Sequence, residues 1–583
     1  MSSATATLRI VALGDFSGRS ETKASRIAVD KERFEEVFAR IAPRLEFTVA
    51  NRIGGAAPQA EISLSPASLR ELGPAAVAEA VPALARLGEL RRAAEAVGRG
   101  ELGADAFRQR ARELASPPLA QALVRLVEGT TTTPPIAPTP PASSAPQAEA
   151  GVDSILGLVE SPGASPPGAR ETARRLVDAL TTRPSAGPGP FARSAAAAAA
   201  AALDEVISAQ LDEILHAPAF SNLESLWRGA KLLVDRTDFR APIVLELVCA
   251  GVDAAGEAID DLAEGEDADL VLAPFELGGG AQDLERAQAL ASAGERAQTP
   301  VVVGIAPAFL GLASWRALAK ARLPQQTFDE PAYTGWRSLR QRDEARWLVL
   351  LANRVALRMP YGAAGQPTRG IAYEEKGALP GLLGSPVWAL GSVAVRSFAR
   401  TGACLQISGS HHALVPDLPL LASSEDARPS PVEGIFGNER REDLEKIGLS
   451  VVQLYQRDVA FFGSVRSFRK PERYPDAEAT ADAAQQCTLA YQIFASRLTK
   501  FLGRTVPDLV GAGAIAAATE TLRTAIIGFL STPEVALGPE RVGVVMKPNP
   551  KDPSATDVAL RVGPDITIAG RPVNVLLHFS LRL

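Results

Sequence analysis

The chain of 583 residues is poor in the features that mark a disulfide framework or a membrane span. Its three cysteines, Cys249, Cys404 and Cys487, lie far apart in apolar surroundings, which is typical of buried free thiols in a reducing compartment. No apolar run reaches the roughly 18 residues that a membrane helix needs. Residues 1–15 show neither the cationic start nor the apolar core of a secretion signal. We therefore expect a cytoplasmic bacterial protein with no direct membrane insertion.

The chain also lacks an excess of positive charge. It carries 61 Lys and Arg against 67 Asp and Glu, a formal net charge of -6. Binding of nucleic acid requires a basic surface that neutralises phosphates, so nucleic acid is not an expected partner. What is present is an ordinary globular composition, with 46% hydrophobic residues. The length favours about three or four folding units.

One stretch interrupts this composition. Between residues 129 and 192, proline, threonine, serine and alanine replace the periodic apolar pattern, which indicates an extended linker. Two islands within it, residues 152–160 and 169–180, have helical spacing. The sequence thus predicts a first module over 1–128, a linker over 129–192 and a second module over 193–583.

The first module is predicted to be a small α+β unit. Residues 8–13 form a strand that ends in a glycine turn, and residues 30–41 form a helix with Asp30 as its N-cap. A short strand pair at 45–49 and 61–64 follows, and then helices over 77–97 and 104–115.

The second module is predicted to be a larger, multi-layer α/β unit. A poly-alanine run over 195–202 leads into a helix with an apolar stripe from Leu203 to Leu215. Continuous apolar runs near 243–250, 269–277 and 299–311 alternate with helical patterns, as in a largely parallel sheet covered on both faces. Residues 572–583 alternate as a strand, and a strand at this position is free to pair with a neighbour.

Motifs for catalysis or cofactor binding are missing. The glycines at 14–18 and 278–280 are not followed by the Gly-Lys-Ser/Thr of a phosphate loop, and Ser408 and Ser410 lack the pattern of a nucleophile elbow. The pair His411 and His412 would need distant carboxylates to hold a metal. We therefore expect no metal site and no cofactor.

Two further sets of residues are candidates for a site. Glu374 and Glu375 near Tyr373 could act as an acid/base pair, but adjacent carboxylates on a surface loop are usually solvated. The tryptophans lie in amphipathic segments, where core packing is the expected role. The five are Trp227, Trp315, Trp336, Trp347 and Trp388. The sequence therefore predicts a protein that is not an enzyme.

Ordered segments of the first module resemble one known subunit. Residues 8–19, 27–49 and 68–93 are similar, in this order, to the small subunit of the type VI secretion contractile sheath. Segments at 203–237, 333–362, 444–449, 459–481 and 573–583 are similar to the large subunit of the same sheath. The chain thus resembles a fusion of two subunits that are separate in the family. The match is loose over 362–432 and poor over 506–549.

The resemblance implies a structural protomer. In this family, small and large subunits form helical sheaths around an inner tube, assembled on a baseplate, and contraction drives the tube outward. Terminal strands join neighbouring protomers by strand addition. The resemblance points to Leu8, Ile10 and Val11 in the first strand, and to Val573, Val575, Leu577, Phe579 and Leu581 in the last, with intramolecular pairing as the alternative.

The resemblance also implies a disassembly partner. Contracted family sheaths are dismantled by an AAA+ ATPase that engages a helix near the start of the large subunit. Residues 152–160 occupy the matching place, with Ile155, Leu156, Leu158 and Val159 as apolar anchors. Because this segment is internal here, a passive linker helix is the alternative.

Two other functions remain open at this point. The chain could be a sheath-like accessory or baseplate component that forms no tubes, or a soluble α/β enzyme whose site escapes the motif search.

Overall fold

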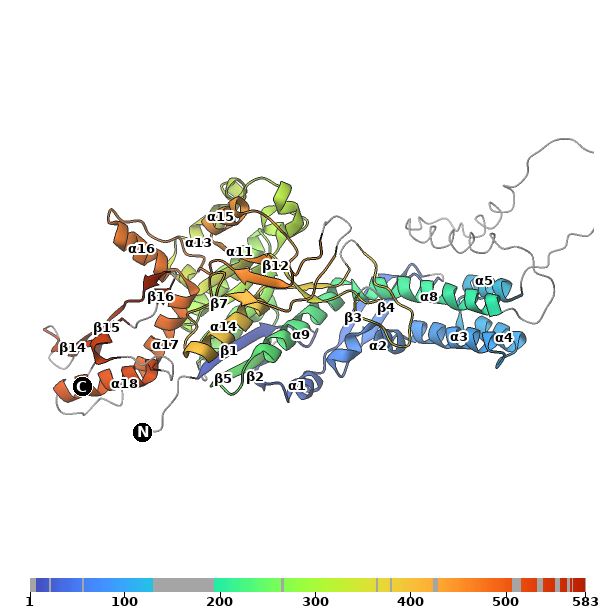
Figure 1. The fold of residues 1–583 in the computed structure, drawn as a ribbon, viewed down its shortest axis with the longest axis horizontal. Helices are drawn as coiled ribbons and strands as arrows, with labels where there is room; N and C mark the ends of the chain where they lie inside the picture. Colours follow the sequence, from blue (N-terminus) through green and yellow to red (C-terminus); the bar gives the residue numbers. More distant parts are fainter. Residues whose placement is uncertain are drawn as a thin grey trace, which may run out of the picture.

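A computed structural model describes residues 7–19, 23–54, 57–128, 193–263, 267–362, 365–377, 380–422, 428–505, 515–531, 538–550, 556–563, 567–568 and 570–581. The predicted linker and its two helical islands lie outside these residues. The molecule is elongated, with a sheet-containing body between a helical arm at one end and a small antiparallel sheet at the other (Figure 1).

The body is built on a nine-stranded sheet of order β11-β13-β12-β8-β7-β6-β1-β5-β2. Six central strands are parallel, and β2, β13 and β11 pair antiparallel at the edges. The prediction of a largely parallel sheet is therefore confirmed. The strands are β1 (Leu8–Gly14), β2 (Lys23–Val29), β5 (Ile243–Cys249), β6 (Leu270–Leu277), β7 (Val301–Ile305), β8 (Leu348–Ala352), β11 (Leu414–Val415), β12 (Leu449–Gln456) and β13 (Val459–Phe462).

Helices cover both faces of this sheet. Residues of α9 (Pro218–Arg236) and α14 (Val387–Thr401) share a core with Leu8 and Ile10 of β1. Residues of α10 (Ala255–Ala263) and α11 (Ala281–Arg296) share a second core with Val11 and Leu13, which point the other way. Both faces of the central strands are apolar and buried, so apolar and polar residues do not alternate along their sequences. Further helices on the side of the second core are α12 (Pro324–Phe328), α13 (Thr334–Leu339) and α15 (Asn438–Lys446).

The two predicted modules share this sheet. Strand β1 from the N-terminal part lies between β5 and β6, with Leu8 opposite Ile243 and Ile10 opposite Leu270. Trp227 of α9 packs against Phe16, Phe34 and Phe38, and its indole N–H donates to the carbonyl of Phe16 over 3.0 Å. The boundary in sequence is therefore not a boundary between two separate folded bodies.

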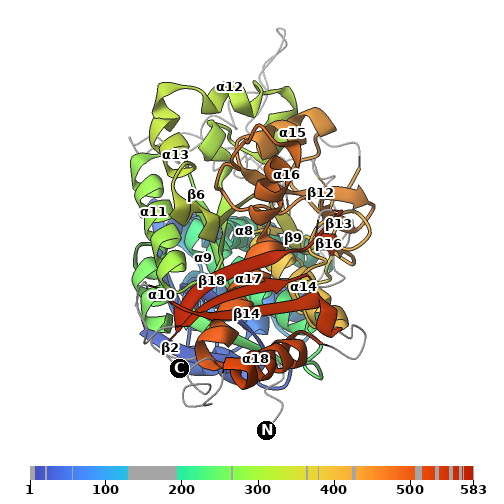
Figure 2. The ribbon, with the colours of Figure 1, turned by 90° about the vertical axis from the view of Figure 1, so that its left-hand side faces the viewer.

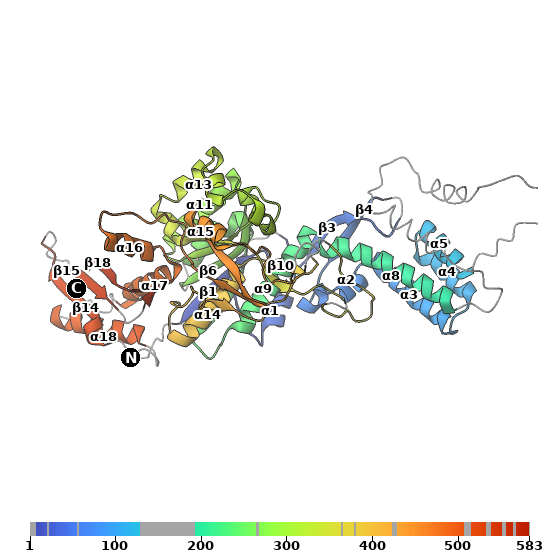
Figure 3. The same ribbon diagram turned by 45° about the horizontal axis from the view of Figure 1, so that its top comes forward.

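The arm consists mainly of helices from both sides of the linker. The longest of them, α8 (Arg193–Leu215), runs along α3 (Pro82–Gly98), as Figures 1 and 3 show. A Cβ on Gly98 would lie 3.2 Å from the methyl of Ala196, so small residues let the two helices approach closely. The arm also contains α2 (Pro74–Ala80), α4 (Ala104–Leu114) and α5 (Pro117–Glu128), and a hairpin of β3 (Leu45–Ala50) and β4 (Gln59–Leu64) lies at its base.

The N-cap assigned to Asp30 is wrong. Helix α1 spans Phe34–Ile41, and no side chain caps it. Asp30 instead accepts hydrogen bonds from the backbone N–H groups of Glu32 and Arg33. The side chain of Asp30 therefore stabilises the turn before the helix and does not cap the helix itself.

The other end of the molecule carries a three-stranded antiparallel sheet of order β14-β15-β18, which faces the viewer in Figure 2. Its strands are β14 (Val542–Pro548), β15 (Thr556–Val562) and β18 (Val575–Leu581), and the neighbouring helices are α16 (Ala477–Gln486), α17 (Leu489–Thr505) and α18 (Ile515–Leu530). Two small strand pairs complete the fold: β9 (Val355–Arg358) with β10 (Leu382–Gly384), and β16 (Thr567–Ile568) with β17 (Arg571–Pro572).

Short 3₁₀ helices connect these elements. They are η1 (Leu69–Leu72), η2 (Val252–Ala254), η3 (Pro307–Leu310), η4 (Trp315–Lys320), η5 (Pro331–Tyr333), η6 (Asp343–Trp347) and η8 (Pro539–Arg541). All five tryptophans and all three cysteines are buried, as predicted, and no disulfide links the three cysteines.

Candidate assembly surfaces

Strand β18 is the outermost strand of the C-terminal sheet. It pairs along its whole length with β15, from Val575 opposite Val562 to Leu581 opposite Thr556. No described strand pairs with its other edge. Unpaired N–H and C=O groups on such an edge can accept a further strand. Val575, Leu577, Phe579 and Leu581 lie on this strand, whereas Val573 precedes it.

The two faces of this sheet differ in burial. Val573 and Val575 are buried, and Leu577 and Phe579 pack against the core half-buried. On the outer face, Leu576 is 63% exposed, and Val545 of β14 is 49% exposed. This difference in burial confirms the predicted alternation of the last strand. Its inward residues hold the sheet to the body.

The assignment of Leu8, Ile10 and Val11 to interprotomer pairing needs correction. These residues lie on β1, and both edges of β1 pair within the chain. All three side chains are at most 1% exposed. An interior strand has no edge to offer a neighbour, so the structure favours the intramolecular alternative for this segment.

The helix proposed as the ATPase-recognised segment, with Ile155, Leu156, Leu158 and Val159, lies outside the described residues. Its role stays a prediction.

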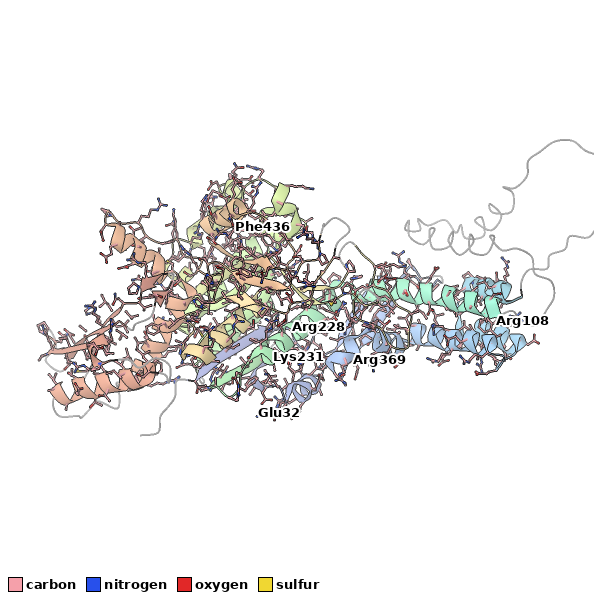
Figure 4. All side chains as sticks on the ribbon, in the orientation of Figure 1. Glu32, Arg108, Arg228, Lys231, Arg369 and Phe436 are labelled. Carbon is pink, nitrogen blue, oxygen red and sulfur yellow. The ribbon has the colours of Figure 1, made fainter. Side chains whose placement is uncertain are left out.

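A buried ion network ties α9 to the segment after β9. The guanidinium of Arg358 donates to Glu224 over 3.0 Å and to both oxygens of Glu375 over 2.7 and 3.2 Å. Its side chain is 2% exposed, and both carboxylates are fully buried. Glu224 also accepts from Arg228, which Figure 4 labels on α9. Charges removed from water this completely are retained only when they are paired.

The interpretation of Glu375 as a solvated loop carboxylate is wrong. Besides Arg358, the carboxylate accepts from the backbone N–H groups of Tyr361 and Gly381. It also lies 3.1 Å from Nε2 of His216. Burial opposes its charge, but the hydrogen bonds from His216 and Arg358 outweigh burial and lower the pKa of Glu375 to about 2. Glu374 beside it is exposed, as predicted.

His216 responds to the same carboxylate. Its hydrogen bond with Glu375 raises the pKa of His216, against the opposing effect of burial. The coulombic field of Asp212 acts in the same direction, and that of Arg358 opposes it. The residues Glu224, Arg358 and Glu375 thus form a structural site that sequence analysis missed, since they are far apart along the chain.

The other candidate residues from the sequence do not form a site. His411 and His412 are exposed in a turn, and the hydroxyl of Ser408 accepts from the backbone N–H of Val465. Within the described ranges, no group of three or more His, Cys, Asp or Glu side chains could hold a metal ion. No helix in these ranges is both long enough and apolar enough to cross a membrane.

Two family models match separate parts of the chain. Residues 4–125 match the family described as "Type VI secretion system, VipA, VC_A0107 or Hcp2". Residues 197–270 and 258–469 match the VipB family, described as "EvpB/VC_A0108, tail sheath N-terminal domain". Together the matches cover more than half of the chain and lie on either side of the linker.

A curated relative supports the second match. The chain is 27% identical over 344 residues to the type VI secretion system sheath protein TssC1 of Pseudomonas aeruginosa. The alignment covers 53% of this chain and 69% of TssC1.

Solved structures with partial similarity include two contractile assemblies. One is the PVC sheath complex of an extracellular contractile injection system in the contracted state, with a TM-score of 0.32, 9% identity, and coverage of 62% of this chain and 77% of that chain. The other is the baseplate of the anti-feeding prophage, with a TM-score of 0.30, 14% identity, and coverage of 61% and 76%.

Proposed function

Because the chain belongs to the type VI secretion sheath family and joins a VipA-like and a VipB-like part, we propose that it is a sheath protomer with both parts on one polypeptide. It polymerises into a helical tube around an inner-tube protein and contracts to drive effector delivery. The resemblance drawn from the sequence is confirmed by the two family matches.

The position of β1 between β5 and β6 carries this proposal. A strand from the VipA-like part completes the main sheet of the VipB-like part, and each of its faces is buried in a different core. Burial of a full strand between two partners joins the two parts into one rigid unit. The unit that polymerises is therefore the whole chain.

Contact between protomers is proposed to use strand addition at β18. Its free edge supports this role, and the candidate residues are Val573, Val575, Leu577, Phe579 and Leu581. A strand added head to tail makes a heterologous contact, and such contacts generate open helical filaments.

The work of the sheath is proposed to come from conformational change rather than from catalysis. An extended state would convert to a contracted state with more favourable contacts between protomers. The chain itself then needs neither cofactor nor metal. Its further proposed partners are baseplate components and an AAA+ ATPase that engages residues 152–160, and its proposed location is the bacterial cytoplasm, on an envelope-anchored baseplate.

Negative-stain electron microscopy of the purified chain, with and without a co-expressed inner-tube protein, tests the proposal. We expect tubes of constant diameter with helical layer lines. Small monodisperse particles under every assembly condition, from protein with a cooperative melting transition, would refute it.

A further inference from the structure

A cavity lined by cationic side chains lies on the body, away from β18. It has a volume of about 470 Å³ and opens among α12, α13, α15, the start of β12 and residues 464–473. The three helices lie together in the upper part of the view in Figure 2. We call this cavity the basic pocket. Its size falls in the range of small-molecule sites.

The most buried cation of the basic pocket is Arg340, which is 9% exposed. Its Nε donates to the carbonyl of Phe468 over 3.1 Å, and its Nη1 donates to the carbonyl of Lys446 over 3.0 Å. Nη2 has no acceptor among the described residues. No described carboxylate forms an ion pair with this guanidinium, although an unpaired buried charge is costly.

The backbone is shaped to hold this charge. Gly448 has a φ of +93°, and a Cβ there would lie 2.8 Å from Nε of Arg340 and 2.9 Å from the ring of Phe468. Only glycine adopts this conformation without strain. Burial lowers the pKa of Arg340 to about 10, so the side chain is still cationic at neutral pH.

Three more cations line the basic pocket without a carboxylate partner among the described residues: Arg466, Lys470 and Arg473. All three are exposed, and the guanidinium of Arg466 donates to the hydroxyl of Ser464 over 3.0 Å.

The other cations of the lining have acceptors in the chain. Arg469 pairs with Asp343 and Glu472, Lys446 lies 3.6 Å from Asp443, and Arg337 donates to backbone carbonyls. The pocket is therefore specifically short of negative charge.

Acidic residues of the lining do not balance the four cations. Only Asp329 and Glu445 are acidic; Glu445 lies 3.2 Å from Arg441 outside the pocket, and the positive charge of Arg466 also acts on it. Arg340 lies over the rings of Phe328 and Phe468, but none of the four cations forms an ion pair with a described carboxylate. A concave site with four such cations favours a compact anion that carries several charges, because one carboxylate side chain would neutralise only one of them.

We propose that the basic pocket binds a multivalent oxyanion of the phosphate class, held by Arg340, Arg466, Lys470 and Arg473. Guanidinium groups donate paired hydrogen bonds to phosphate oxygens, and a lysine ammonium adds a point charge. The site lies away from the β18 edge and does not depend on polymerisation.

Calorimetric titration of the full-length chain with inorganic pyrophosphate tests this proposal, with chloride added to equal ionic strength as the blank. We expect one site per chain. The double variant R466Q/R473Q removes two exposed cations and leaves Arg340 in place, so it should fold. Loss of two charge-assisted hydrogen bonds is expected to weaken binding about tenfold or more.

The matched control is R369Q/R400Q, which removes two exposed cations outside the basic pocket; Arg369 is labelled in Figure 4. It should bind pyrophosphate as the wild type does. Titration with ADP distinguishes the source: equal affinity shows that the diphosphate alone is recognised, and tighter binding identifies a nucleotide.

Three results would overturn the proposal. One is the absence of binding at millimolar pyrophosphate, and another is equal weakening in both double variants. The third is loss of tubes in R466Q/R473Q without any effect of pyrophosphate, which would assign the pocket to carboxylates of a second copy of the chain.

Discussion

Single buried charges decide how the segment after β9 is held. In Glu375→Gln, Arg358 keeps only Glu224 as a carboxylate partner, inside a region closed to water. Removal of one partner from a buried pair costs about 3–5 kcal/mol. We expect the free energy of unfolding, measured from the first transition in urea, to fall by this amount. Glu374→Gln, one residue away and exposed, is the matched control and should change stability by less than about 0.5 kcal/mol. Equal shifts in the two variants would contradict the assignment.

The hydrogen bond between His216 and Glu375 makes stability depend on pH. The pKa of His216 is raised in the folded state. A raised histidine pKa contributes stability that is fully present below the unfolded value of 6.5 and is lost as pH rises through the folded value. We expect wild type to exceed His216→Gln in melting temperature at pH 6, and the difference to shrink toward pH 9. A difference that is constant over this range would show that the histidine acts only through packing.

The contrast between Glu374 and Glu375 shows what sequence analysis can predict at this scale. Two identical neighbours have the same local pattern, so composition and spacing assign both to solvent. Glu375 is buried because Arg358 and His216 form hydrogen bonds with it from other elements, and Glu224 binds the same guanidinium of Arg358. Tryptophan positions were predictable, since apolar size alone favours burial.

At the scale of elements, the close packing of α9 against α14 depends on a glycine, Gly229, which leaves room for the ring of Trp388. A Cβ on Gly229 of α9 would lie 2.1 Å from the ring of Trp388 on α14. Gly229→Ala should therefore destabilise the body by about 1–3 kcal/mol, seen as a lower melting temperature. Gly503→Ala in α17 meets nothing within 4 Å and should raise stability by up to about 1 kcal/mol, because alanine is the better helix former. Destabilisation by both alanines would show that space at Gly229 is not the cause.

The free edge of β18 predicts a separation of folding from assembly. Successive N–H groups of an antiparallel strand point to alternate edges, so either Leu577→Pro or His578→Pro removes a bond to β15 and the other only blocks the free edge. Each proline variant is compared with alanine at the same position. The variant that melts like its alanine counterpart should form no tubes in negative stain. Normal tubes from both proline variants would exclude strand addition at this edge.

Strand and helix types were largely predictable from periodicity, whereas partners were not. Apolar runs such as 243–249 and 301–305 are strands buried on both faces, as expected. The place of β1 was missed, because a sequence pattern shows that a strand is buried but not which strands flank it. For the last strand, the sequence pattern was more informative: the alternation of residues in 575–581 correctly indicated a sheet with one outer face.

At the scale of the whole molecule, the proline-rich boundary divides the sequence but not the fold. One core includes Leu8 and Leu90 from before the linker together with Leu245 and Trp388 from after it. The two parts therefore act as subunits that are joined covalently at equal stoichiometry. Covalent joining raises the effective concentration of each part around the other, which matters most at low expression.

This arrangement predicts how a divided chain behaves. Residues 1–128 and 193–583, co-expressed with an affinity tag on the first, should copurify at equal stoichiometry, because β5 and β6 flank β1 and Trp227 fills a pocket made by Phe16, Phe34 and Phe38. Residues 193–583 alone should aggregate, since β1 and β2 are then both missing, which leaves one edge of β6 and both edges of β5 without their partner strands. The copurified pair should form the same tubes as the intact chain and should differ from it only in losing assembly on dilution. If each part instead purifies alone as a monodisperse, cooperatively melting protein, the shared sheet is not what unites the two halves of the protomer.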